Sequence, residues 1–122
     1  MVTAPPGRMP VTLIGAFGPT CVMIEAFSRS LAAEIGPHGV RVVCLRSSGS
    51  PKSPGVQKAF DQHPKTAGES RDEYHAELKK GTLLRRLTKL TEVANVASFM
   101  ASDLANSITG TSTNISCGSS VD

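Results

Sequence analysis

The chain has 122 residues, a mass of 12.8 kDa, a formal net charge of +3 and a pI of about 9.0. Hydrophobic residues make up 39% and charged residues 19%, a composition that fits a globular protein with a small core and excludes a disordered tail. No apolar run approaches the roughly 18 residues of a membrane span, and residues 1–10 lack the charged-then-apolar pattern of a secretory signal. We expect one domain, or part of one, in the cytoplasm.

The cysteines and the basic residues both favour structural roles. Three cysteines, none in C-x-x-C spacing, predict reduced and buried thiols. Tyr74 is the only tyrosine and tryptophan is absent, so the aromatic platforms of a nucleic-acid surface are missing. We therefore interpret the basic run as a solvated helical surface; it contains Lys79, Lys80, Arg85, Arg86 and Lys89.

The N-terminal third is predicted to hold a loop and one long helix. Proline and glycine interrupt residues 1–16, which indicates a loop that begins with the last residues of a strand at 1–3. Pro19 suits the first turn of a helix, and Gly36-Pro37 stops that helix after Ile35. Its apolar residues cover more than one stripe, so we expect it to pack on a sheet with one side and on another subunit or helix with the other. These residues are Val22, Met23, Ile24, Ala26, Phe27, Leu31, Ala32 and Ile35.

A buried strand and a long loop are predicted in the middle of the chain. Val40 to Leu45 is a nearly continuous apolar run, typical of a parallel strand covered on both faces. Residues 46–56 are rich in serine, proline and glycine and predict a loop, in the place where α/β folds bind ligands. Short helices are expected at 56–62 and 70–80, the second with Ser70 as its N-cap.

The last third is predicted to contain a helix and a final strand. Thr91 is the expected cap of a helix from Glu92 to Ala101, and the final strand runs from Thr111 to Cys117. The residues expected to face inward are Val93, Ala94, Val96, Ala97 and Met100. The order of elements predicts an α/β fold that is part of a doubly wound parallel sheet. Such a sheet has an open edge, which indicates either association with another chain or a missing N-terminal half.

Two kinds of site are not indicated by the sequence. A dinucleotide site needs a glycine-rich turn whose backbone N–H groups reach the pyrophosphate, and the glycines here never give G-x-G-x-x-G or a Walker loop. The chain is therefore not expected to bind a pyrophosphate in the usual way by itself. Three scattered histidines without regular ligand spacing predict no metal site.

Two segments resemble a known protein family. Residues 24–42 look very like the catalytic helix and following strand of short-chain dehydrogenases/reductases. Residues 92–103, followed by Ile108-Thr109-Gly110, are similar to the family's late helix and its turn into the last strand. The resemblance covers about residues 15–118 and corresponds to the C-terminal half of the family. It implies a Rossmann-like doubly wound fold, oxidoreductase chemistry, an NAD or NADP cofactor, and dimers or tetramers.

The resemblance also implies where the family's catalytic groups would stand. The family uses a serine, a tyrosine as acid/base, and a lysine four residues later that lowers the tyrosine pKa and holds the ribose. In this register the tyrosine position is Phe17 and the lysine position is Cys21. Phenylalanine has no proton to transfer, and cysteine supplies no fixed positive charge. The serine position falls near Ala4, and Thr3 replaces it only if the register shifts by one.

A candidate cofactor contact lies in the loop after the middle strand. The family's Pro-Gly, which lies against the nicotinamide, corresponds to the first two residues of a serine-rich stretch. The candidate cofactor-binding residues are Ser47, Ser48, Gly49 and Ser50. The alternative is an ordinary flexible loop.

Cys21 is a candidate nucleophile, because a helix N-terminus lowers a thiol pKa. His38 lies at the opposite end of the helix, whereas His63 and His75 could approach as its base. The alternative is a cysteine that only packs.

Three hypotheses for the function remain open. The first is an oxidoreductase-like chain, a single partial domain over residues 1–122, inactive alone because the dinucleotide-binding half and the Tyr/Lys pair are absent. The second is a non-catalytic module that forms a homo-oligomer through the helix at 19–35 and the last helix and strand. The third is a small-molecule pocket without redox chemistry in residues 47–82. No nucleic-acid or membrane partner is expected, and no substrate is predicted.

Overall fold

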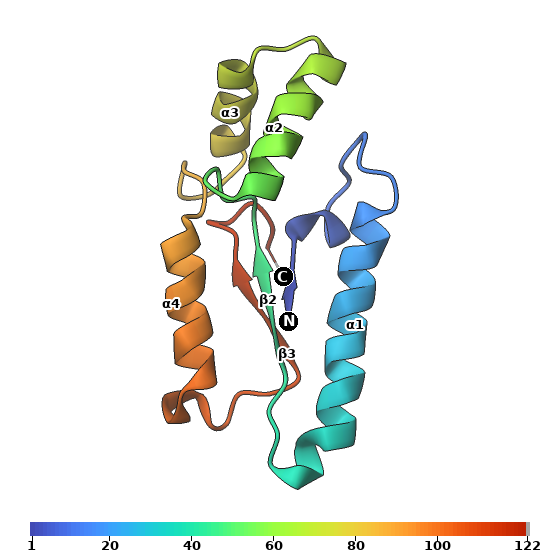
Figure 1. Ribbon diagram of the computed structural model, residues 1–122, viewed down its shortest axis with the longest axis vertical. Helices are drawn as coiled ribbons and strands as arrows, with labels where there is room; N and C mark the ends of the chain where they lie inside the picture. The colour runs from blue at the N-terminus through green and yellow to red at the C-terminus, as the bar shows by residue number, and fades with distance from the viewer. Residues whose placement is uncertain (122) are drawn as a thin grey trace.

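A three-stranded parallel sheet forms the centre of the molecule (Figure 1). The computed structural model describes residues 1–121, except for the side chain of residue 67. Strand β1 (Val2–Thr3) pairs with β2 (Val43–Ser47), and β2 pairs with β3 (Thr111–Ile115), all in parallel. Within the described residues, β1 and β3 each have one edge without a strand partner. The predicted α/β fold with a parallel sheet is confirmed.

Helices cover both faces of this sheet and one of its ends. Figure 1 shows α1 (Phe17–Ile35) on one side and α4 (Leu90–Ala101) on the other. Helices α2 (Pro54–Ala67) and α3 (Arg71–Lys80) stand together beyond the carboxyl end of β2. Short 3₁₀ turns follow β1, α1 and α4. In the described part of the chain, no helix is both long enough and apolar enough to cross a membrane.

Helix α1 packs on the sheet through small side chains. Its buried residues recur every three or four positions and are Gly18, Cys21, Glu25, Ser28 and Ala32. Such spacing places them on one face of the helix, and their mostly small size lets the helix approach the strands closely. The larger apolar side chains lie on the outside, where Met23 is 63% exposed and Phe27 is 57% exposed. The predicted contact with the sheet is confirmed, and contact with another subunit stays a prediction.

Several predicted boundaries are wrong for local reasons. The middle strand begins at Val43 and continues to Ser47. The final strand ends at Ile115, because Cys117 and Gly118 adopt φ values of 54° and 77°, which turn the chain. The first of the two short helices is longer than expected and spans Pro54–Ala67.

The start of α4 also differs from the prediction. Thr91 is not its cap, because the helix begins at Leu90 and the Lys89 backbone N–H donates to Glu92 Oε2 at 2.9 Å. The Glu92 carboxylate therefore satisfies this N–H two residues before the expected cap. Ala94 is exposed and does not face inward.

The cap of α3 is confirmed. Ser70 Oγ accepts the backbone N–H of Glu73 at 3.2 Å, and Glu73 Oε2 accepts the backbone N–H of Ser70 at 2.9 Å. This reciprocal pair is a capping box. It also lowers the pKa of Glu73, because the hydrogen bonds from Ser70 favour the carboxylate.

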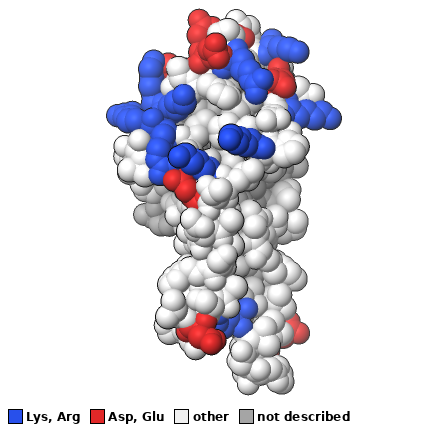
Figure 2. All heavy atoms as spheres, turned by 60° about the vertical axis from the view of Figure 1, so that its left-hand side comes forward, with Lys and Arg blue, Asp and Glu red and all other residues white. Residues whose placement is uncertain are grey.

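The basic run forms an exposed surface on α3 and on the segment that leads to α4. Figure 2 shows lysine and arginine side chains gathered in the upper part of that view, above a surface with few charges. All five residues of the run are exposed. Acidic neighbours offset part of this charge, since Glu77 pairs with Lys80 at 2.5 Å and Glu92 with Arg86 at 2.8 Å. The predicted exposure is confirmed, whereas a helical surface is wrong for three of the five residues, because only Lys79 and Lys80 lie on a helix. The absence of a nucleic-acid partner stays a prediction.

Candidate functional site

A cleft of about 740 Å³ opens at the carboxyl end of the sheet. Its wall is formed by β1 and the segment after it, the loop after β2, helices α2 and α3, and the start of α4. Open α/β sheets bind ligands beyond the carboxyl ends of their strands, and small-molecule sites have volumes of this order. We therefore take this cleft as the candidate functional site.

The structure places the four predicted cofactor-contact residues together on the cleft wall. Ser47 Oγ donates to the Ser48 carbonyl oxygen at 3.0 Å, and the Ser48 and Thr88 hydroxyl oxygens lie 2.7 Å apart. A Cβ at Gly49 would lie 3.2 Å from Val56 Cγ1, so glycine lets the loop approach α2 closely. Hydroxyl groups therefore line the cleft here, and contact with a cofactor stays a prediction.

The start of α1 carries Phe17 and Cys21, the two residues that the sequence register predicts at the positions of the family's Tyr/Lys pair. Phe17 lies on the cleft wall and is 52% exposed. Cys21, one turn later, is 2% exposed and is not part of the cleft wall. The Thr3 hydroxyl donates to the Cys21 carbonyl oxygen at 3.1 Å, so Thr3 serves to hold α1 against β1. The Phe17 side chain has no exchangeable proton and the Cys21 thiol is buried away from the cleft wall, so neither presents an exchangeable proton to the cleft. That these two residues replace the family's Tyr/Lys pair stays a prediction.

The structure brings no histidine to Cys21. His63 of α2 stacks on Tyr74 of α3, with ring centroids 6.2 Å apart, and His75 packs on Phe60. Among the described residues, no hydrogen bond joins the Cys21 thiol to an imidazole. These contacts favour a packing role for Cys21 over a nucleophilic one.

Metal-ligating side chains are not gathered in the region that the structure describes. No group of three or more His, Cys, Asp or Glu residues there could hold a metal ion.

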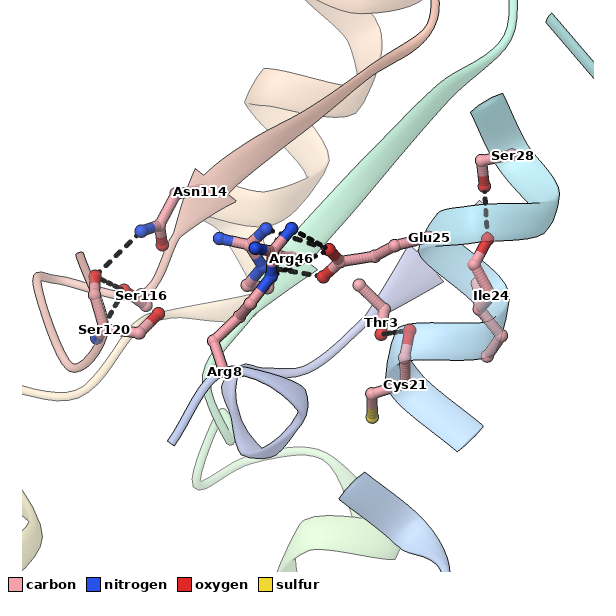
Figure 3. Close-up of polar contacts among 10 residues, drawn as sticks. All are labelled: Thr3, Arg8, Cys21, Ile24, Glu25, Ser28, Arg46, Asn114, Ser116 and Ser120. Carbon is pink, nitrogen blue, oxygen red and sulfur yellow. Dashed lines mark hydrogen bonds and ion pairs between the residues drawn. The ribbon is translucent and has the colours of Figure 1, made fainter. Parts of the chain in front are cut away.

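Beside the cleft, three charged side chains form a buried cluster (Figure 3). Arg46 Nε donates to Glu25 Oε1 at 2.7 Å, and Arg46 Nη2 donates to Glu25 Oε2 at 3.0 Å. Arg8 Nη2 donates to the same Oε2 at 2.9 Å. The side chains of Glu25 and Arg46 are buried, whereas that of Arg8 is partly exposed. The hydrogen bonds from Arg46 and then those from Arg8 lower the pKa of Glu25, against the opposing effect of burial.

This cluster fixes the segment that forms one side of the cleft. Glu25 comes from α1, Arg46 from β2, and Arg8 from the chain just before residues 9–17. Residues 9, 11, 13, 14 and 17 of that segment lie on the cleft wall. Our sequence reasoning missed the cluster, although an arginine at the end of an apolar strand was a signal, because buried charges are rare unless they are paired.

Aromatic side chains from α2 and α3 form the opposite side of the cleft. Phe60 meets Tyr74 edge-on with centroids 5.8 Å apart, and His63 stacks on the other side of the pair. Phe60, His63 and Tyr74 all lie on the cleft wall. Burial, with a smaller contribution from the charge of Glu69, raises the pKa of Tyr74. The residues of this aromatic cluster come from two helices, and no local sequence pattern predicts that they meet.

The described residues do not fit a whole dinucleotide. No Asp, Glu, Lys or Arg among them lines the cleft. Phosphates are usually held by arginine, lysine or a glycine-rich turn at a helix N-terminus. The described cleft wall therefore lacks the groups that usually bind a pyrophosphate.

Comparison with known proteins identifies the family. A sequence profile of the family described as Enoyl-(Acyl carrier protein) reductase matches residues 8–120. A short-chain dehydrogenase/reductase of Armillaria gallica is 30% identical over 112 residues, which cover 92% of this chain and 41% of the relative. The chain belongs to the short-chain dehydrogenase/reductase family. The short-chain reductase NovJ of Streptomyces niveus is 32% identical over 78% of this chain and 34% of its own length.

Solved structures of short-chain dehydrogenases/reductases show the same fold. Sorbitol-6-phosphate 2-dehydrogenase of Erwinia amylovora matches with a TM-score of 0.90 at 24% identity, over 99% of this chain and 47% of that one. A 3-ketoacyl-(acyl-carrier-protein) reductase of Brucella melitensis, solved with NADH, matches with a TM-score of 0.79 at 21% identity, over 98% and 43%. The chain thus spans less than half the length of these relatives, and it matches about half of their Rossmann-like fold.

Proposed function

We propose that this chain is a member of the short-chain dehydrogenase/reductase family that does not transfer hydride by itself. The observation that carries the proposal is the pair at the start of α1. Phe17 lies on the cleft wall and Cys21 is buried. The sequence register predicts that these two residues stand at the family's tyrosine and lysine positions. Reduction of a carbonyl group needs a proton donor at the substrate oxygen, and neither side chain supplies one.

The lack of a dinucleotide turn supports the same proposal. The Brucella melitensis reductase was solved in complex with NADH, and NAD or NADP is the cofactor class that family membership suggests. These 122 residues contain no glycine-rich dinucleotide turn, and the cleft wall of the described chain carries no lysine or arginine. We therefore expect no tight cofactor binding by this chain alone.

Titration of the purified chain with NADH and NADPH by calorimetry tests the proposal. We expect no binding tighter than about 100 μM, which corresponds to roughly −5.5 kcal/mol. In a parallel assay with an aromatic aldehyde, we expect no loss of the reduced-nicotinamide absorbance. Oxidation of NADH or NADPH that depends on the aldehyde and on the chain would overturn the proposal. Tight binding without turnover would leave the chain non-catalytic but would correct the cofactor expectation.

A second candidate function is a non-catalytic association module. The observation that favours it is the exposed outer face of α1, where Met23 and Phe27 lie one helical turn apart. Large exposed apolar side chains that are neighbours on a helix favour contact with another surface. This function and the first one are compatible, because the outer face of α1 lies opposite the face that packs on the sheet.

A further inference from the structure

The described wall of the cleft combines an apolar surface with the absence of Asp, Glu, Lys and Arg side chains. Apolar side chains reach it from the segment before α1 and from the starts of α1, α2 and α4, and they include Leu13, Phe17, Val56 and Leu90. Leu13 and Phe17 are among the exposed large hydrophobic residues of the molecule. Water in contact with such a surface is displaced favourably by an apolar ligand. A charged ligand, in contrast, would lose water without meeting a countercharge among the described wall residues.

The aromatic side of the cleft favours a ring. Tyr74 and His63 are stacked, and Phe60 meets Tyr74 edge-on, so ring faces and ring edges are both close to the cleft. Aromatic rings prefer offset-stacked or edge-to-face partners. A planar ring of a ligand would therefore extend a cluster that the protein already holds in place.

Neutral hydrogen-bonding groups complete the wall. The hydroxyl of Tyr74 makes no hydrogen bond with the described residues, and its raised pKa keeps it protonated at neutral pH. Ser119 Oγ is buried at the wall and has no partner within the described chain. Ser50 is also buried on the cleft wall. Hydroxyl groups of this kind can bind a neutral carbonyl or hydroxyl oxygen of a ligand.

From these observations we propose that the cleft binds an uncharged, largely apolar small molecule that carries an aromatic ring and a neutral oxygen group. The inference rests on the proposed function, in that the cleft serves for binding without hydride transfer. It goes further by naming the class of ligand.

The N-terminus of α2 is a feature of the described wall that could attract an anion instead. Ser53 and Gly55 at its start lie on the cleft wall, and the N–H groups of a first turn lack intrahelical partners. The same N–H groups can donate to a carbonyl or hydroxyl oxygen. Ligands of one shape that differ only in charge therefore separate the two possibilities.

Three probes with the same two-ring frame test the proposal by calorimetry on the purified chain. We expect 2-naphthol to bind with a dissociation constant below about 100 μM. We expect 2-naphthyl phosphate, which is charged, and decahydro-2-naphthol, which is not aromatic, to bind at least tenfold more weakly. Failure of 2-naphthol to bind would overturn the proposal, and so would equal or tighter binding of either comparison probe.

A pair of variants locates the bound probe. Val56→Asp places a carboxylate on the cleft wall at the third position of α2, where an acidic residue suits the helix dipole. Gln57→Asp adds the same charge at the next residue, which is exposed and lies outside the cleft wall. We expect Val56→Asp to weaken 2-naphthol binding at least tenfold and Gln57→Asp to change it less than twofold. Equal effects of the two variants would overturn the assignment to this cleft.

The cofactor titration separates this inference from the proposed function. If 2-naphthol fails to bind while NADH is not oxidised, the ligand class is wrong and the non-catalytic function stands. If NADH is oxidised with an aldehyde while 2-naphthol binds, the non-catalytic function is wrong and the ligand class stands.

Discussion

At the scale of single residues, the ion cluster of Glu25, Arg46 and Arg8 holds a helix, a strand and a loop in one arrangement. Burying Glu25 and Arg46 costs hydration energy, and their mutual hydrogen bonds offset that cost. Removing one partner leaves the other side chain buried and charged, without the hydrogen bonds that replaced its hydration. Breaking the cluster at one partner is therefore expected to destabilise the fold.

The substitution Glu25→Gln removes one charge from this cluster while preserving the size of the side chain. We expect the free energy of unfolding at pH 7 to fall by roughly 3 kcal/mol, as measured by urea denaturation. Because the folded-state pKa of Glu25 lies below its ordinary value of 4.5, the ionised form stabilises the fold above that pH. The contribution is lost as pH falls below about 4.5 through the folded-state pKa, so the difference between wild type and variant should shrink there.

The control for this experiment is Glu34→Gln, which removes an exposed carboxylate from the same helix. It should change the free energy of unfolding by less than about 0.5 kcal/mol at either pH. A difference for Glu25→Gln that stayed constant from pH 7 to pH 3 would contradict the assignment of the effect to ionised Glu25.

At the scale of elements, α2 and α3 form one side of the cleft with few buried side chains of their own. Helix α3 has ten residues, none of them buried, and Phe60 of α2 supplies the main buried contact between the pair. A helix this short is marginal without tertiary packing or capping. The capping box of Ser70 and Glu73 is therefore expected to contribute much of the local stability of α3.

Replacement of Ser70 by alanine tests this dependence. Loss of the hydroxyl that accepts the Glu73 N–H should destabilise α3 by about 1 kcal/mol. Amide hydrogen exchange should then be faster by about fivefold in residues 74–80 and unchanged in α1. The comparison variant is Ser30→Ala, at an exposed site in the middle of α1, which should leave exchange in α3 as it is in wild type.

At the scale of the whole molecule, the described chain leaves two kinds of surface without a partner. Each outer strand of the sheet has a free edge, and the outer face of α1 exposes large apolar side chains. Exposed strand edges and contiguous apolar patches both favour association. We therefore expect oligomers of this chain in solution.

The variant Phe27→Glu tests association through α1. We expect the wild-type chain to sediment as an oligomer at micromolar concentration and the variant to shift toward monomer, because a charge replaces an exposed apolar contact. Leu84→Glu is the matched control, since Leu84 is 60% exposed, close to the 57% of Phe27, but lies in the segment after α3. A wild-type monomer, or equal shifts in both variants, would count against the α1 interface.

The sequence by itself determined the order and type of the main elements. Apolar spacing, Pro19 in a first turn and the β-branched run near residue 42 are local signals, so they predicted α1, β2 and a parallel sheet. The capping pattern predicted the start of α3 at Ser70, whereas the competing carboxylate of Glu92 moved the start of α4. The position of the serine-rich loop could also be predicted, because it lies within one short segment. The replacement of the Tyr/Lys pair by Phe17 and Cys21 stays a prediction from the sequence.

Only the tertiary structure decided which distant side chains meet. Arg46 reaches Glu25 across 21 positions of sequence, and residues 9–17 face Tyr74 across a single cleft. These contacts depend on the crossover from α1 to β2 and on the position of α2 and α3 beyond the carboxyl end of β2 (Figure 1). Local patterns contain no information about such approaches, because the side chains become neighbours only after the sheet has formed. The absence of Asp, Glu, Lys and Arg from the described cleft wall, which carries the ligand proposal, therefore follows from the fold.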